Sequence, residues 1–317
     1  MIQRPTRFGA AMIITGLFVA ACSSGGGATA SPSASAAPPS ASASESASAS
    51  TSAGTSPSAA AITCASGSIT SAGSTALQPL IDKAGKDYVA ACPGAQIQVQ
   101  GGGSGTGLTQ VSQGAVQLGA SDVTAESKLP AADAANLVDH IIAKQGWVMV
   151  VNPDVTGVTN LTSAQATDIW TGKVTNWKDV GGPDEAIVLI LRPESSGTRA
   201  TFKKIVLGGA KEATGQALTE DSNGAVTTAV KGTPGATSVI GFAYYAQNKG
   251  QVTALQLDGT EATVDNMAAG TYKLSADGHV YSKGQPDGLA KSFIDYLLGP
   301  VVQGTTIPSL FYAPAVK

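Results

Sequence analysis

The sequence has few charged and few aromatic residues, at 13% and 5%, and its formal net charge is −3. Nucleic-acid-binding domains present a basic face, so this balance argues against nucleic acid as a partner. The shortage of aromatic rings argues against a sugar site built on stacked rings. Histidine is nearly absent too. His140 and His279 lie in no recognisable triad context or metal-ligand spacing, so a serine hydrolase, a phosphatase and a metal site have little support.

The first 21 residues are typical of a signal peptide. Arg4 and Arg7 precede an apolar run over residues 8–21, which is too short to span a membrane. The run ends at Cys22 after small residues, which resembles a bacterial lipobox, where the cysteine carries a lipid. An ordinary secretion signal with a chance cysteine is the alternative. Residues 23–61 are almost entirely Ser, Ala, Pro, Gly and Thr, so we expect residues 22–61 to be a lipid-anchored, disordered tether.

The other two cysteines, Cys64 and Cys92, remain as a pair if Cys22 carries lipid. Outside the cytoplasm such pairs form disulfides. Each cysteine stands just before a predicted strand, and in a parallel sheet two strand starts can be neighbours. A disulfide is therefore predicted, with two buried free thiols as the alternative.

From Ile62 onward short strands and helices alternate, which predicts an α/β fold with largely parallel sheets. The predicted strands cover residues 68–73, 96–100, 115–122, 147–153, 186–193 and 239–245. The predicted helices cover residues 75–91, 161–172, 196–207, 223–236 and 288–299, with Thr162 or Ser163 capping the second. The region has about 255 residues, which is enough for two lobes.

Three strand-to-helix turns share one chemistry. We call them the first turn (73–75, GST), the second turn (103–107, GSGTG) and the third turn (195–198, SSGT). Each places small hydroxyl residues at a helix N-terminus, where backbone N–H groups are unpaired and the helix dipole favours an anion. One such turn is usually just a helix cap, but three in one chain predict a small anion held on several sides. Neither G-x-G-x-x-G nor G-x-x-x-x-G-K-[ST] occurs, so this is not an ATP phosphate loop.

Two charged residues refine the predicted anion. Arg192 ends an apolar strand just before the third turn, and its guanidinium can bind two oxygens of an oxyanion. Asp122 ends another strand; as an acceptor it selects an oxyanion that carries a proton, such as phosphate, over sulfate. Asp122 could instead cap the residues that follow. Glu194 either braces Arg192 or is an ordinary surface acid.

From about Ser68 to Pro314 the chain resembles the phosphate-binding subunit of the Pst-type bacterial phosphate ABC transporter, a substrate-binding lipoprotein. The motifs that carry the resemblance are GSTALQPL, VQGGGSGTG, LGASD, LTSAQATDIWTGKVTNWKDVGGPD, RPESSGTRATF, SNGAVTTAV and GLAKSFIDYLLGP, in the same order. The resemblance implies a two-lobed, type II periplasmic-binding-protein fold that closes on phosphate. Lobe I should comprise residues 62–147 and 243–317, and lobe II residues 148–242.

The resemblance also implies the ligand set, position by position. The phosphate-binding positions are Ser74, Thr75, Ser104, Asp122, Arg192, Ser196, Gly197 and Thr198, with Ser121 and Glu194 in supporting places. Asp122 matches the proton-accepting aspartate of the family. The residue before it is Ser121, and whether that serine contacts the ligand stays open.

The function expected from this resemblance is capture of inorganic phosphate and delivery to an ABC permease, without catalysis, cofactor or metal. The protein should be a monomer held at the extracytoplasmic face of the cell membrane by its lipid anchor. The alternatives are a surface phosphate sensor or adhesin without a transport role, and a binder of another tetrahedral oxyanion.

Overall fold

The structure is a computed structural model that describes residues 62–215 and 217–315. The predicted signal peptide, the lipidation site Cys22 and the predicted tether lie outside the described residues. Within the described part, none of the helices combines the length and the apolar character that a membrane crossing requires.

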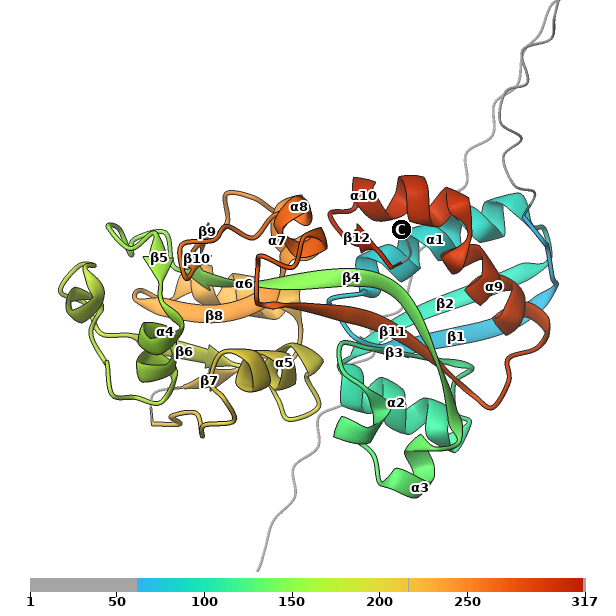
Figure 1. Cartoon of the computed structure of the whole chain (residues 1–317), viewed down its shortest axis with the longest axis horizontal. Coiled ribbons are helices and arrows are strands. Elements are labelled where there is room, and N and C mark those ends of the chain that lie inside the picture. Colours follow the sequence, from blue (N-terminus) through green and yellow to red (C-terminus); the bar gives the residue numbers. More distant parts are fainter. Residues whose placement is uncertain (1–61, 216, 316–317) are drawn as a thin grey trace, which may run out of the picture. The chain divides into compact units, whose positions relative to one another are not determined.

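The N-terminal part of the described chain is built from parallel strand–helix–strand units (Figure 1). Its strands are β1 (Gly67–Gly73), β2 (Ala95–Gly102) and β3 (Leu118–Ser121), and its helices are α1 (Gln78–Ala91) and α2 (Ser104–Gln113). Strand β1 pairs in parallel with both β2 and β3, which confirms the predicted parallel sheet. Helix α1 buries Leu80, Ile81, Ala84 and Tyr88 at helical spacing.

One long strand and its antiparallel partner connect this part to the rest of the sheet. Strand β4 (Leu137–Val151) pairs with β11 (Ser275–Lys283), and β11 pairs with β3. On the other side β4 pairs with β8 (Ala236–Gly241), and β8 pairs in parallel with β6 (Val188–Leu191). With β7 (Leu218–Thr219) the order is β2-β1-β3-β11-β4-β8-β6-β7. The predicted strand over residues 147–153 covers only the last part of β4, residues 147–151, and β11 was missed.

The remaining elements are short or cover the sheet. The helices are α3 (Ala131–Ala134), α4 (Ser163–Trp170), α5 (Gly197–Ile205), α6 (Asn223–Gly232), α8 (Val264–Ala268), α9 (Gly288–Leu298) and α10 (Ile307–Ser309). The minor strands are β5 (Asn160–Leu161), β9 (Thr253–Ala254), β10 (Gln256–Leu257) and β12 (Ala313–Pro314).

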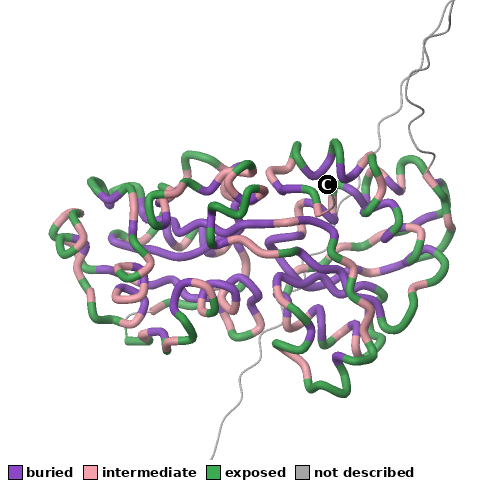
Figure 2. The backbone as a smooth tube through the Cα atoms, viewed as in Figure 1, coloured by how far each residue is buried: buried purple, intermediate pink, exposed green. Residues whose placement is uncertain are grey.

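Two large hydrophobic clusters stabilise the two ends of the sheet, and Figure 2 shows buried backbone in each. One cluster is centred on α1 and α9 and includes Leu80, Tyr88 and Phe293. The other includes Trp147, Trp177 and the buried apolar residues of α5, α6 and β8, and it also takes in residues of the segment 252–274. The predicted limits of the two lobes stay a prediction.

One predicted strand is partly wrong. Residues 239–245 were expected to be extended, but β8 ends at Gly241 and α7 (Phe242–Gln247) begins immediately after it. The run of aromatic residues favours a strand locally. In the fold, however, the helical turn buries Phe242, Ala243 and Ala246, and this packing overrides the local preference. The predicted helix over residues 75–91 also begins later, at Gln78.

The predicted disulfide between Cys64 and Cys92 is confirmed. It joins the segments that precede β1 and β2, and these strands are parallel neighbours. The bond thus fixes the starts of the two strands, at the opposite end from the turns that follow them.

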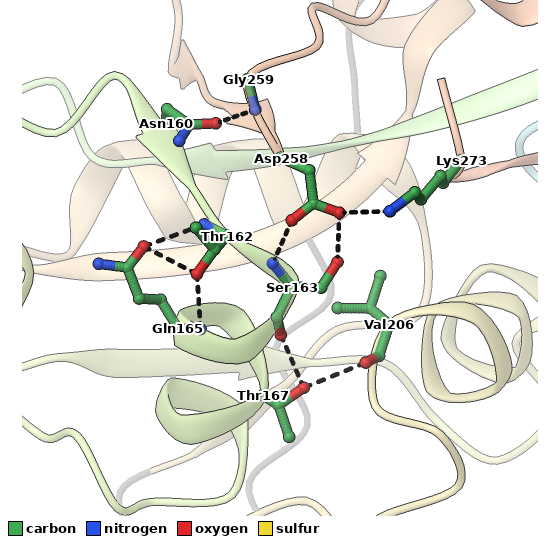
Figure 3. A network of polar contacts seen from close by, with 9 residues as sticks. All are labelled: Asn160, Thr162, Ser163, Gln165, Thr167, Val206, Asp258, Gly259 and Lys273. Carbon is green, nitrogen blue, oxygen red and sulfur yellow. Dashed lines mark hydrogen bonds and ion pairs between the residues drawn. The ribbon is translucent and has the colours of Figure 1, made fainter. Parts of the chain in front are cut away.

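The N-terminus of α4 is held by a polar network (Figure 3). Thr162 caps the helix and forms a capping box with Gln165, as one of the two predicted caps. The carboxylate of Asp258 accepts hydrogen bonds from the backbone and the hydroxyl of Ser163, both at 2.7 Å, and pairs with Lys273 at 3.0 Å. The hydrogen bonds from Ser163 lower the pKa of Asp258. The network ties α4 to the loop after β10, away from the predicted anion site.

Candidate anion-binding site

The three predicted turns lie at the C-terminal ends of β1, β2 and β6, where open α/β sheets bind ligands. The second and third turns touch. The backbone N–H of Gly105 donates to the carbonyl of Ser195 at 2.8 Å. A Cβ atom on Gly197 would overlap the hydroxyl of Ser104 and lie 2.8 Å from Oδ2 of Asp122, so only glycine fits there. Two turns more than 90 positions apart in the sequence therefore meet at one place.

Asp122 lies at the centre of these turns and is 3% exposed. Its Oδ1 accepts from the hydroxyl of Ser74 and from Nε2 of Gln145 at 3.1 Å. Its Oδ2 accepts from Oγ1 of Thr198, over a longer 3.4 Å. The carboxylate therefore contacts the first and third turns and does not cap the segment after β3. Burial raises the pKa of Asp122, although the hydrogen bonds from Ser74 and Gln145 and the charge of Arg192 oppose this shift.

Arg192 faces the same group of polar residues around Asp122, which we call the anion cluster, and is also 3% exposed. Its guanidinium is held from behind by the carbonyls of Glu220, at 3.1 Å, and Asp221, at 3.0 Å. One terminal nitrogen, Nη2, points to Oγ1 of Thr75 at 3.3 Å. Burial lowers the pKa of Arg192, and the charge of Asp122 opposes the shift. A guanidinium anchored in this way presents its remaining N–H donors to the cluster in a fixed direction.

Thr198 is oriented by a residue that sequence analysis did not select. The indole Nε1 of Trp147 donates to Oγ1 of Thr198 at 3.0 Å, so the threonine hydroxyl is free to donate towards Asp122. Trp147 lies at the middle of the sheet, on β4 beside β8. The apolar run around it gave no hint of a role at the site.

Two further polar residues of the cluster were missed. The side-chain amide of Asn223 donates to the carbonyl of Thr75 at 2.9 Å and accepts from Nη1 of Arg192 at 3.4 Å. Gln145 donates to Asp122, and its Oε1 is buried without a hydrogen-bond partner among the described residues. The only hint in the sequence that Gln145 belongs to the site is that it is a polar residue close to the apolar run that begins at Trp147.

Unpaired backbone donors complete the site. Within residues 62–215 and 217–315, no acceptor pairs with the backbone N–H groups of Thr75, Ser104, Gly197 and Thr198. Ser196 caps α5 by accepting from the N–H of Arg199 at 3.2 Å, which leaves the first N–H groups of that helix unpaired. Unpaired N–H groups at helix starts, hydroxyls and a buried guanidinium are the donors that bind oxyanions in proteins.

Comparison with known proteins gives the family of the chain. A family model described as "PBP superfamily domain" matches residues 45–301. The phosphate-binding protein PstS of Bacillus subtilis is 48% identical over 250 residues, covering 79% of this chain and 81% of the relative. The chain belongs to the PstS family.

Solved structures give the same fold for this PstS-family chain. A phosphate ABC transporter substrate-binding protein from Clostridium perfringens, solved with bound phosphate, has a TM-score of 0.72 and 30% identity. The match covers 78% of this chain and 100% of the Clostridium perfringens chain. An ABC-type phosphate transport receptor from Vibrio cholerae has a TM-score of 0.62 and 29% identity, with the same coverages. These type II periplasmic binding proteins confirm the predicted fold class.

The two supporting positions implied by the PstS-family motifs lie at the edge of the cluster. The hydroxyl of Ser121 donates to the carbonyl of Val123 at 2.6 Å and so points away from Asp122. The side chain of Glu194 is 80% exposed and pairs with Arg199 at 3.0 Å, not with Arg192. Glu194 is thus a solvent-facing acid that pairs with Arg199 and does not brace Arg192.

The two histidines lie outside the cluster. Nδ1 of His279 lies 3.0 Å from both carboxylate oxygens of Asp139, and Nε2 of His140 lies 3.3 Å from the hydroxyl of Ser282. Among the residues that the structure describes, no group of three or more His, Cys, Asp or Glu side chains could hold a metal ion.

Proposed function

We propose that this PstS-family protein binds inorganic phosphate between its two lobes and delivers it to an ABC permease. The observation that carries the proposal is the buried carboxylate of Asp122, set among the three turns and opposite Arg192. The printed names of its relatives, phosphate-binding protein PstS and a phosphate transporter protein with bound phosphate, support the same ligand.

The chemistry of the cluster fits phosphate better than sulfate. Arg192, the unpaired N–H groups and the hydroxyls of Thr75 and Ser104 supply donors for an anion's oxygens, while the hydroxyl of Thr198 donates to Asp122. Ser74 and Ser196 position Asp122 and the third turn through their own hydrogen bonds. Phosphate near neutral pH carries a proton that it can donate to Asp122. Sulfate carries none, so it would leave the carboxylate facing another acceptor.

Binding is coupled to closure of the lobes. Contacts between Thr198 and Asp122, between Arg192 and Thr75, and between Asn223 and Thr75 join residues assigned to different lobes. An anion that binds both sides stabilises the joined arrangement, so closure is a population shift. Charge-assisted hydrogen bonds contribute about 1.5–3 kcal/mol each, and a few of them net of desolvation reach about −8 kcal/mol, or about micromolar affinity.

We further propose that the protein is a monomer anchored by lipid on Cys22 at the extracytoplasmic face of the cell membrane, with residues 22–61 as a tether. The disulfide between Cys64 and Cys92 supports an oxidising compartment. We propose a role in binding and not in catalysis, because neither histidine lies where it could act as a base in the anion cluster. His279 contacts Asp139, and His140 contacts Ser282.

Transport and sensing are separated by an experiment with the permease. The protein would be added to proteoliposomes that contain the phosphate ABC permease, and ATP hydrolysis and phosphate entry would be measured. We expect both to require the protein together with phosphate, and to fail with Arg192→Ala. Tight phosphate binding without any stimulation of the permease would favour a sensor or adhesin instead.

A further inference from the structure

A second polar feature borders the third turn on the outer side of α5. It is a pocket of about 560 Å³ lined chiefly by Lys128, Glu194, Ser196, Arg199, Lys203 and Lys204. Ser196 also caps α5 beside the anion cluster. The pocket and the anion cluster therefore both border the third turn, but the pocket is lined by lysine side chains and the cluster by hydroxyls, Asp122 and Arg192.

The pocket carries a net positive charge, with Lys128, Arg199, Lys203 and Lys204 against Glu194 and Glu212, although the chain as a whole carries −3. Arg199 is neutralised by Glu212, at 2.7 Å, and by Glu194, at 3.0 Å. Lys203 and Lys204 form no ion pair within the described ranges 62–215 and 217–315. The lysine charges of the pocket thus have no acidic partner of their own.

Lys128 connects the pocket to the anion cluster. Its Nζ donates to the carbonyl of Glu194 at 2.7 Å, next to the third turn. Burial lowers the pKa of Lys128; the charges of Arg199 and Lys203 lower it further, and those of Glu194 and Asp122 oppose the shift. Lys128 therefore places one ammonium group of the pocket directly beside the backbone that enters the third turn.

We propose that this pocket is a low-affinity capture site for free inorganic oxyanions, from which phosphate passes to the cluster around Asp122. The proposal rests on the proposed function and deepens it. A lysine ammonium is a point charge whose donors have no fixed direction, so the pocket should bind phosphate and sulfate alike. Selection between the two anions should follow at Asp122. Such a site raises the association rate and leaves the dissociation rate unchanged.

The test uses Lys203→Gln/Lys204→Gln, which leaves Lys128 and its contact in place. The control, Lys231→Gln/Lys249→Gln, removes the same charge from two exposed lysines that do not line the pocket. Phosphate association is followed by stopped-flow tryptophan fluorescence, because Trp147 contacts Thr198 in the site. At about 10 mM ionic strength we expect the pocket variant to associate about threefold to tenfold more slowly than the wild type, and at about 0.5 M nearly equally.

A second readout detects occupancy directly. The backbone amides of Gly208 and Gly209 line the pocket, and their NMR signals should shift in a second step at millimolar phosphate or sulfate. That step should vanish in the pocket variant and persist in the control.

Several results would overturn the proposal. One is an equal slowing of both double variants, which would show an effect of net charge alone. Another is unchanged association in the pocket variant together with loss of binding to phosphatidylglycerol vesicles, which would assign the pocket to lipid headgroups. A wild-type protein that binds no phosphate would overturn both this inference and the proposed function, whereas normal phosphate affinity with no effect of Lys203 and Lys204 would overturn this inference alone.

Discussion

Replacing Asp122 by asparagine should abolish discrimination against sulfate while preserving the shape of the site. In the wild type, Oδ1 already accepts from Ser74 and Gln145, and Oδ2 has only the 3.4 Å contact with Thr198. Oδ2 is therefore the atom available for the proton of phosphate. Sulfate cannot form the charged hydrogen bond to Oδ2, and the loss of about 1.5–3 kcal/mol corresponds to about 10- to 150-fold. Sulfate also leaves Oδ2 as a buried acceptor that faces another acceptor, and this further cost brings the expected discrimination to about 100- to 1,000-fold.

In the variant, the two donors at Oδ1 hold the amide oxygen there, so the amide NH₂ group takes the place of Oδ2. It donates to sulfate and no longer accepts from phosphate. We expect sulfate affinity to rise by at least about 30-fold and phosphate affinity to fall by about 10-fold. Calorimetric titration of the wild type, Asp122→Asn and the exposed control Asp133→Asn with each anion measures both ratios. If Asp122→Asn rejects sulfate as strongly as the wild type, the acceptor mechanism is wrong.

The raised pKa of Asp122 gives this prediction a pH dependence. Because the pKa is higher in the folded than in the unfolded protein, the group stabilises the fold fully below the unfolded value, about 4, and this stability is lost as pH rises through the folded pKa. Thermal unfolding without ligand should therefore show a decline with rising pH that is absent in Asp122→Asn. Wild-type affinity for sulfate should rise as pH falls, because the protonated carboxyl can donate. A sulfate affinity that does not depend on pH would contradict this.

Three further substitutions probe other parts of the account. Arg192→Lys keeps the charge but loses the planar guanidinium, whose N–H donors can bind two oxygens at once. Calorimetry should therefore show phosphate affinity reduced roughly 10- to 150-fold. Gly197→Ala places a methyl group against the second turn and so opposes closure of the lobes, and phosphate affinity should fall at least about 100-fold. The unfolding temperature of the ligand-free protein should change little, because without ligand the lobes can separate and relieve the overlap. The double variant Cys64→Ser/Cys92→Ser should lose about 2–4 kcal/mol of unfolding free energy in urea titrations and keep its phosphate affinity, because the disulfide joins the far ends of the strands.

The strand-to-helix turns could be predicted because their chemistry is local. Glycine and hydroxyl residues between an apolar strand and an amphipathic helix determine a turn with free N–H groups, and in the structure α2 and α5 begin within the second and third turns, at Ser104 and Gly197. The pairing of Cys64 with Cys92 was predictable for the same reason, since both stand directly before neighbouring strands.

The rest of the site depends on contacts between distant segments. Gln145 and Trp147 reach the cluster because β4 runs through the middle of the sheet, and Asn223 because α6 packs beside the first turn. None of these contacts leaves a periodic signal in the sequence. Strand β11 was missed because its mixed sequence, SADGHVYSK, shows no clear alternation. Glu194 pairs with Arg199 rather than Arg192 because Arg192 is already held by backbone carbonyls.

The measurement that tests the central claim most directly is calorimetric titration of the phosphate-free protein near neutral pH, first with phosphate and then with sulfate. The account predicts one-to-one binding of phosphate at about micromolar affinity or tighter, and no detectable heat with sulfate over the same range. Equal binding of the two anions would contradict the role of Asp122, and binding of neither would contradict the phosphate site itself.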